Sequence, residues 1–146
     1  MSEHENPIPQ VLEAYRAAVL AKDVDAFVAL YDEDVEVFDA WAAWSHRGRA
    51  AWRAAVAGWF GALGAGRVAV DFEDVRSELA PGLAVVHAFA RYAELDATGT
   101  PLRSMDNRFS AVLRRRDGAW RIVHEHTSAP IGFEDSRAIL SRAPKA

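Results

Sequence analysis

Residues 114–128 have the sequence RRRDGAWRIVHEHTS, and the Asp117-Gly118 pair near the start of this stretch decides the fold. A tight two-residue turn needs a positive φ at both central residues, and Asp-Gly is one of the pairs that adopt it most readily. Apolar and polar residues alternate on both sides of the pair. The pattern therefore predicts a β-hairpin, with residues 102–116 in one strand and residues 119–128 in the next.

The same turn predicts the register of the hairpin. Counting outward from the turn places Ala111 opposite His124. One face of the second strand then carries Trp120, Ile122, His124 and His126, and its apolar start predicts that this face points inward. The small side chain of Ala111 would leave room for a ligand beside His124.

Helical periodicity replaces this alternation in the N-terminal part of the chain. Apolar residues recur at helical spacing in three segments, which end near Lys22, near Tyr31 and in the glycine-rich residues 61–66. Asp23 is a suitable cap for the second segment. Residues 35–39 alternate in hydropathy and are predicted to form a short strand between the second and third helices.

Strands begin again at Arg67. Residues 67–80 and 83–95 are predicted strands joined by a turn at Pro81-Gly82, and the hairpin extends them to a four-stranded meander. Helices followed by antiparallel strands are typical of an α+β domain, here a curved mixed or antiparallel sheet with three N-terminal helices enclosing a pocket. The apolar tail after Pro130 would form a short helix or cover a sheet edge.

The composition predicts one globular domain spanning residues 1–146. The chain is 51% hydrophobic and 26% charged, and its net charge of −4 argues against a nucleic-acid-binding protein. No apolar run is long enough to cross a bilayer. The chain contains no cysteine, which excludes thiol catalysis and zinc–thiolate sites. These features and the polar residues 1–7 favour a cytoplasmic protein that binds neither nucleic acid nor membranes.

Asp39 is the most informative candidate for a catalytic group. It shares a strand face with Val35 and Val37, which predicts that its carboxylate points inward. A carboxylate beside aromatic walls, which Trp41 and Trp44 would supply, is suited to act as a general base. The alternative is an aspartate at a strand end that caps the following loop.

Tyr15 lies on the apolar stripe of the first helix, so its hydroxyl needs a partner inside the protein. As a functional group it could donate a hydrogen bond to an oxyanion that develops on a ligand. The alternative is a buried tyrosine that donates to a backbone carbonyl.

His124 and His126 are candidates for proton carriers or for residues that orient Asp39. They could also hold a metal, but the spacing places no third ligand, and a hydrogen-bonded core histidine is the remaining alternative. Neither a metal nor a cofactor is predicted. Val56 and Phe89 are predicted as further walls of the pocket.

Two segments resemble members of the nuclear transport factor 2-like superfamily. Tyr15, the Ala-Leu-Tyr-x-x-Asp pattern of residues 29–34, Asp39 and Gly48 resemble bacterial ketosteroid isomerases without a gap. Residues 115–130, RRDGAWRIVHEHTSAP, resemble SnoaL-like proteins and the association domain of calcium/calmodulin-dependent kinase. The resemblance implies a cone-shaped fold, with Tyr15 as the oxyanion donor and Asp39 as the group that moves the proton.

The isomerase pattern is incomplete in this chain. In ketosteroid isomerase a protonated aspartate supplies a second oxyanion donor, and the corresponding position aligns near Ser110 or Ala111. Asp106 is the nearby carboxyl group, but the register places it on the face opposite His124, so that only a β-bulge would bring it to the ligand. His124 and His126, which the isomerases lack, would replace the missing donor.

The leading expectation is a cofactor-independent SnoaL-like enzyme. It would perform acid–base chemistry (isomerisation, cyclisation or dehydration) on a small hydrophobic molecule. The alternative is a non-catalytic ligand-binding or oligomerisation module that resembles the kinase association domain. A homodimer is expected because Phe38, Val112 and Val123 leave an apolar outer face on the sheet, and a protein kept mainly for that interface is the third possibility.

Overall fold

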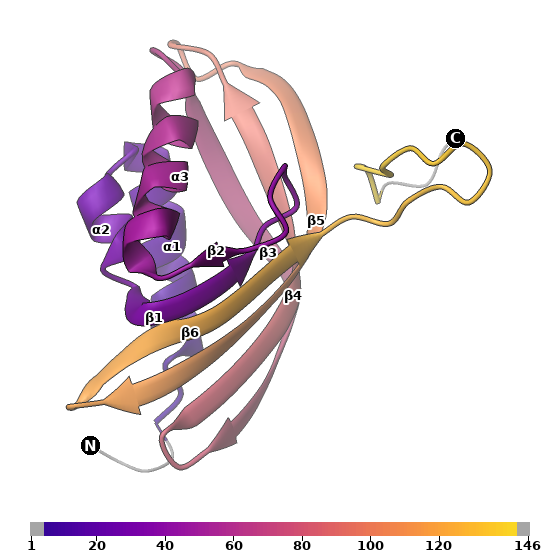
Figure 1. Cartoon of the computed structure of the whole chain (residues 1–146). Coiled ribbons are helices and arrows are strands. Elements are labelled where there is room, and N and C mark those ends of the chain that lie inside the picture. Colours follow the sequence, from indigo (N-terminus) through magenta and orange to yellow (C-terminus); the bar gives the residue numbers. More distant parts are fainter. Residues whose placement is uncertain (1–4, 143–146) are drawn as a thin grey trace.

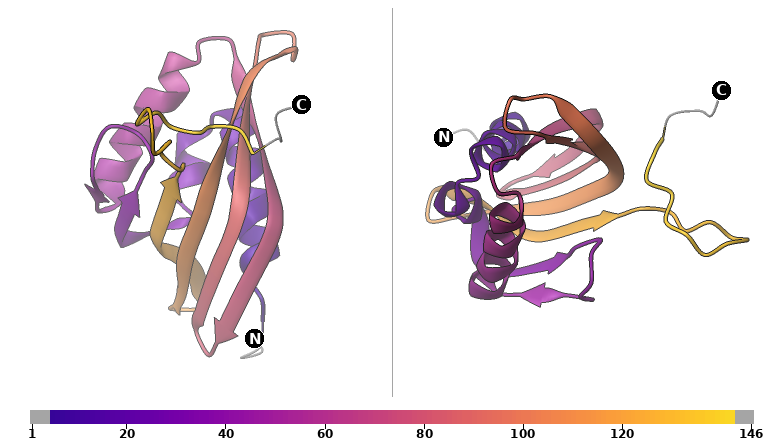
Figure 2. Two further views of the ribbon diagram at one scale, coloured as in Figure 1. Left: turned by 90° about the vertical axis from the view of Figure 1, so that its right-hand side faces the viewer. Right: turned by 90° about the horizontal axis from the view of Figure 1, so that it is seen from above.

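The computed structural model describes residues 5–142, so most of the polar N-terminal segment lies outside the described residues. Three helices, α1 (Ile8–Ala21), α2 (Val24–Val28) and α3 (Arg49–Ala62), cover the concave face of one curved sheet (Figures 1 and 2). The predicted α+β arrangement is confirmed. None of the helices described here has the length and apolar character that crossing a membrane requires.

The sheet has six strands in the order β2-β1-β6-β5-β4-β3. All neighbouring strands are antiparallel except β1 and β6, which run parallel. The strands are β1 (Tyr31–Phe38), β2 (His46–Arg47), β3 (Arg67–Ala80), β4 (Leu83–Leu95), β5 (Pro101–Arg116) and β6 (Ala119–Ser128).

Local sequence sets the helix ends. Lys22 adopts a left-handed conformation after α1, and the Asp23 carboxylate caps α2 by accepting a backbone hydrogen bond of 3.0 Å. α2 ends at Val28, earlier than predicted, and Tyr31 begins β1 instead of completing the helix. Pairing with Ile122 in the parallel ladder, together with complete burial of the Tyr31 ring, outweighs the helical periodicity.

The predicted hairpin between β5 and β6 is confirmed at its turn. Asp117 and Gly118 have φ values of 52° and 78°, and Leu113 pairs with Ile122 as counted from the sequence. Both positions are in the left-handed region, which Asp-Gly tolerates and most other pairs do not.

A β-bulge at Val123 then changes the register of β6. The extra residue shifts the pairing with β5 by one position, which turns every later side chain to the opposite face from the one predicted. Glu125 and Thr127 therefore point inward and are buried, whereas His124 and His126 point outward. The predicted inward orientation of the two histidines is wrong.

Aromatic packing joins the helices to the sheet. The Tyr15 ring on α1 contacts Phe27 on α2 and Phe109 on β5, with ring centroids 4.9 and 5.8 Å apart. Val35 and Val37 of β1 are fully buried beneath the helices. Asp39, which follows them on the same face, is thereby aimed toward the interior.

The tail after Pro130 forms no helix among its described residues. Residues 140–142 return to the sheet: the Asp106 amide of β5 donates a hydrogen bond of 2.7 Å to the carbonyl oxygen of Leu140, so this part of the tail covers the β5 edge beyond the end of β6. Residues 129–139, here called the C-terminal arm, project away from the domain (Figures 1 and 2). Backbone hydrogen bonds hold the arm in a closed loop: Gly132 donates to Arg137 at 2.7 Å, and Ile139 donates to Pro130 at 2.8 Å.

Candidate functional site

A cavity of about 700 Å³ lies between the helices and the sheet, within the size range that holds a small organic molecule. α3, the loop after β1 and the ends of β4 and β5 form its walls. Most of the lining is apolar. Its large apolar side chains include Trp41, Trp52, Val56, Trp59, Val68 and Met105.

Asp39 places a carboxylate on the wall of this cavity. Its Oδ1 accepts a hydrogen bond of 3.1 Å from the Thr127 hydroxyl, which itself accepts from the Ala40 amide. Its Oδ2 accepts a long bond of 3.4 Å from the Trp41 amide. A carboxylate has about four acceptor sites, so these bonds orient Asp39 and leave it able to accept from a ligand. The residue both caps the loop and lines the cavity.

Tyr15 meets a second tyrosine on the cavity wall rather than a backbone carbonyl. Its hydroxyl lies 2.9 Å from the hydroxyl of Tyr92, and both residues line the cavity. One hydroxyl donates to the other, so the pair retains one O–H for a ligand. Burial raises the pKa of Tyr15 well above its ordinary value, and Tyr92 and Glu125 raise it further. The pair therefore remains protonated at physiological pH.

Glu125 is a buried carboxyl group, which the predicted register had placed on the outer face of the sheet. Its side chain is 1% exposed, and its Oε1 accepts a 2.6 Å hydrogen bond from the Tyr31 hydroxyl. Burial raises the pKa of Glu125 to about 8 and the charge of Asp39 adds to the increase, against the opposing effect of the Tyr31 bond. Most of the Glu125 population is thus protonated at pH 7. A count outward from the turn could not find it, because the bulge is not visible in the alternation.

Two further polar side chains on the wall were not predicted. Asn107 of β5 is 4% exposed and donates to the backbone carbonyl of Asp106 at 2.9 Å. Trp52 of α3 is 5% exposed, and its indole N–H makes no hydrogen bond of acceptable geometry with any described residue. The position of Trp52 on the stripe of the third helix was visible in the sequence, but a stripe does not reveal an unpaired donor.

The comparisons with known proteins agree with the fold. The family model of the SnoaL-like domain matches residues 8–132. The chain belongs to the SnoaL-like domain family. None of the curated proteins matches this SnoaL-like domain.

Solved structures similar to the SnoaL-like domain share its fold. An NTF2-like protein of unknown function from Pseudomonas putida KT2440 is 27% identical, with a TM-score of 0.83 and 94% of each chain covered. Aln2 from a Streptomyces species is 17% identical, with a TM-score of 0.73 over 83% of this chain and 86% of that one. A protein from Xanthomonas campestris, assigned as a calcium/calmodulin dependent protein kinase II association domain, is 19% identical, with a TM-score of 0.68 over 84% and 85%.

His124 and His126 lie on the outer face of the SnoaL-like domain, away from the cavity. Both imidazole rings contact the ring of Phe38, with centroids 4.8 and 5.6 Å apart, and Nδ1 of His124 lies 2.8 Å from the carbonyl oxygen of Glu36. The bulge at Val123 is the reason for this orientation. Among the described residues, no group of three or more histidine, aspartate or glutamate side chains is arranged to hold a metal ion.

Several of the predicted wall residues lie outside the cavity. Trp44 is 96% exposed in the loop after β1, whereas Trp41 lines the mouth and is 58% exposed. Phe89 lies on the outer face beneath the guanidinium group of Arg142, 3.6 Å from the ring centroid. Ala111 is buried in the core opposite Glu125, and the predicted space beside it does not exist.

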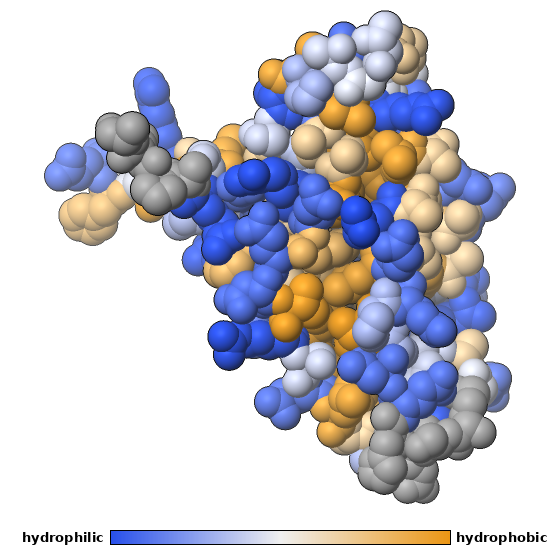
Figure 3. Space-filling model, turned by 180° about the vertical axis from the view of Figure 1, so that it is seen from behind, coloured by the Kyte–Doolittle hydropathy of each residue, from blue (hydrophilic) through white to orange (hydrophobic). Residues whose placement is uncertain are grey.

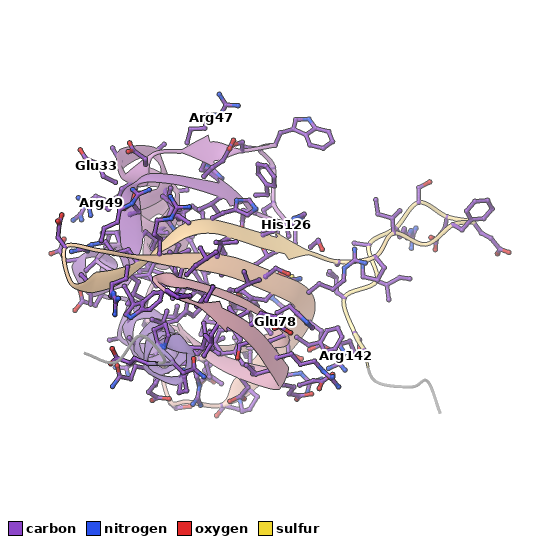
Figure 4. All side chains as sticks on the ribbon, turned by 90° about the horizontal axis from the view of Figure 1, so that it is seen from below. Glu33, Arg47, Arg49, Glu78, His126 and Arg142 are labelled. Carbon is purple, nitrogen blue, oxygen red and sulfur yellow. The ribbon has the colours of Figure 1, made fainter. Side chains whose placement is uncertain are left out.

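Asp106 also lies on the outer face, and the bulge in β6 does not bring it to the ligand side. Its carboxylate accepts hydrogen bonds of 2.8 and 3.2 Å from Arg91, its partner on β4, and one of 2.8 Å from the Arg142 amide. Arg91 holds the pKa of Asp106 below its ordinary value. Asp106 therefore fastens residues 140–142, the returning tail that follows the C-terminal arm, to the sheet. Arg142 is labelled in Figure 4.

Proposed function

We propose that this SnoaL-like domain binds a small, largely apolar carbonyl compound in its cavity and transfers a proton on it. The observation that carries the proposal is that one aromatic cavity contains both the Asp39 carboxylate and the Tyr15–Tyr92 hydroxyl pair. A carboxylate with unused acceptor sites can take a proton from the carbon next to a carbonyl group. A neutral phenol can donate to the oxygen on which negative charge then develops.

Isomerisation of a β,γ-unsaturated ketone illustrates the proposed chemistry. Asp39 removes a proton from the α carbon, and the electron pair moves onto the carbonyl oxygen to form a dienolate. The hydroxyl pair stabilises this oxygen. Asp39 then returns the proton to the γ carbon, the double bond moves into conjugation, and the carbonyl group is restored. Substrate and product differ only in the positions of one proton and one double bond, so no cofactor takes part.

The test uses cyclohex-3-enone, whose conversion to the conjugated enone is followed by ultraviolet absorbance. We expect acceleration over buffer by the wild-type protein, a loss of about 100-fold or more with Asp39→Asn, and a smaller loss with Tyr15→Phe. Asp34→Asn is the matched control because Asp34 lies exposed on β1, the strand that immediately precedes Asp39. Full turnover by Asp39→Asn, or a wild-type rate equal to that in buffer, would overturn the proposal.

A second candidate function is a non-catalytic homodimeric module of the cytoplasm, and the C-terminal arm favours it. Phe133 is fully exposed and Ile131 is 70% exposed, although backbone hydrogen bonds hold the arm in a defined shape. Apolar residues also form a band across the face seen in Figure 3. Apolar surface of this kind is typical of interfaces. The fold shared with the protein assigned as a kinase association domain is consistent with assembly.

A further inference from the structure

Two neighbouring groups act on the ionisation of Glu125 in opposite directions: the charge of Asp39 opposes it, whereas the Tyr31 hydrogen bond favours it. Four residues interact electrostatically with Glu125: Tyr31 of β1, Asp39 directly after β1, Tyr15 of α1 and Tyr92 of β4. None of these four groups is a cation, and Asp39 is itself a carboxylate. Because charge on a buried carboxyl group without a positive partner is costly, the neutral acid is the favoured form.

The other elements around Glu125 and the cavity do not shift Glu125 toward its ionised form. β5 places the methyl group of Ala111 opposite Glu125. At the mouth Arg103 is 82% exposed and donates to Glu94 at 2.7 Å, so its charge is both paired and solvated. His46 lies on the cavity wall with its ring 5.4 Å from that of Trp52. The inner end of the cavity thus carries neutral hydrogen-bond donors.

Trp52 provides an independent observation that points to a ligand. Its indole ring lines the cavity, its Nε1 is buried, and that atom has no partner of acceptable geometry among the described residues, although it lies near the Tyr31 hydroxyl. An indole nitrogen can only donate. Buried donors without acceptors are rare in folded proteins, so an acceptor on a bound molecule would complete this site.

We infer that the cavity selects neutral ligands with a hydrogen-bond acceptor at one end, and that Trp52 and the Tyr15–Tyr92 pair hold this acceptor. Glu125 is a positioning residue, which maintains this selectivity while it is protonated. The inference rests on the proposed ligand cavity and names its ligand class: apolar, neutral carbonyl compounds. An anionic ligand would meet the Asp39 carboxylate without a compensating cation. Ionised Glu125 would add a second negative charge in the buried interior next to the cavity.

The test measures binding, by tryptophan fluorescence, of three naphthalenes of similar shape. They are 2-acetylnaphthalene, which is neutral with an acceptor, 2-ethylnaphthalene, which lacks the acceptor, and 2-naphthoate, which is anionic. We expect the wild-type protein to prefer 2-acetylnaphthalene, and its affinity to fall as the pH rises above 8. Trp52→Phe should weaken the binding of 2-acetylnaphthalene by about five- to tenfold, which is the effect of losing one hydrogen bond. The affinity for 2-ethylnaphthalene should change little.

Glu125→Gln keeps position 125 neutral at every pH, so we expect the affinity of this variant for 2-acetylnaphthalene not to fall above pH 8. The exposed control Glu33→Gln should retain the wild-type profile. An unchanged alkaline decline in Glu125→Gln, or equal affinity for 2-naphthoate, would overturn the inference. If Glu125→Gln does not fold, the wild-type pH profile and the Trp52→Phe ligand pair still decide it. Binding is measured without turnover, so failure of the isomerisation assay with selective binding intact would affect the proposed function alone.

Discussion

The Tyr31 hydroxyl donates a hydrogen bond of 2.6 Å to the carboxyl group of Glu125, which lies 94 positions later in the chain. Both side chains are closed to solvent, with exposed fractions of 0% and 1%. The bond joins β1 to β6, the two strands that run parallel in an otherwise antiparallel sheet. It therefore combines a role in stability with a role in the electrostatics of the cavity.

Tyr31→Phe should lower the free energy of unfolding by about 1–3 kcal/mol, because it leaves the buried Glu125 carboxyl group without its hydrogen-bond partner. Urea denaturation at pH 7 measures this change. Glu125→Gln and the double variant complete a double-mutant cycle. A coupling energy near zero would show that the bond does not contribute to stability.

The stability of the protein should fall as the pH rises from about 5 to about 8. Below the ordinary glutamate pKa of 4.5, Glu125 is protonated in both the folded and the unfolded chain. Between this value and about 8 only the folded chain keeps the proton, so the contribution of Glu125 declines by about 1.4 kcal/mol per pH unit. Above pH 8 the loss is complete.

Urea denaturation across this pH range compares the wild-type protein with Glu125→Gln. The variant cannot titrate at this position, so the wild-type protein should lose stability relative to it as the pH rises. Glu33→Gln, at an exposed position on β1, should follow the wild-type curve. Parallel curves for the wild type and Glu125→Gln would mean that Glu125 does not hold its proton.

Asp106→Asn should release the returning tail from the sheet. The substitution removes the charge that accepts from Arg91 and from the Arg142 amide, so amide hydrogen exchange in the peptide containing Arg142 should become faster. Because Arg91 lowers the pKa of Asp106, the wild-type tail should loosen only in acid, below the ordinary aspartate range. Asp96→Asn, in the turn between β4 and β5, serves as the control, and equal exchange in both variants would contradict the assigned role.

The chain should be a homodimer by light scattering at micromolar concentration, and Phe133→Ser should weaken the dimer by about tenfold or more. Phe133 is fully exposed on the arm, as expected for a residue that a second copy covers. Leu20→Ser is a control at a partly exposed position on α1. A monomeric wild-type protein would refute the dimer, whereas a dimer unaffected by Phe133→Ser would exclude the arm from the interface.

Most of the fold follows from local patterns, because turn chemistry and helical stripes act over a few residues. The Asp117-Gly118 turn and the inward face of Val35, Val37 and Asp39 are examples. β6 differs because both faces of residues 124–127 are polar, so alternation could not reveal the shift that a bulge introduces.

Side-chain size is misleading on β4. A large apolar side chain predicts that Phe89 points inward, yet the inward positions on either side of it are Ala88 and Ala90. Phe109, which pairs with Ala88, fills this part of the core, and small residues accommodate it. The orientation of Phe89 thus depends on a residue of the neighbouring strand, which a pattern within one strand does not contain.

Because of the bulge at Val123, residues 124–127 carry two alternative sets of functional groups, one on each face of the strand. With the bulge, the carboxyl group of Glu125 and the hydroxyl group of Thr127 point into the interior, and Thr127 lines the cavity. In a regular strand of the same residues, the imidazoles of His124 and His126 would take their places. One irregularity of the backbone, rather than the residues alone, therefore decides the chemistry of the interior. Relatives with the same residues in this strand can differ in which side chains they present to a ligand. Alignments of such proteins therefore need to be compared with the face of the strand to which each residue points.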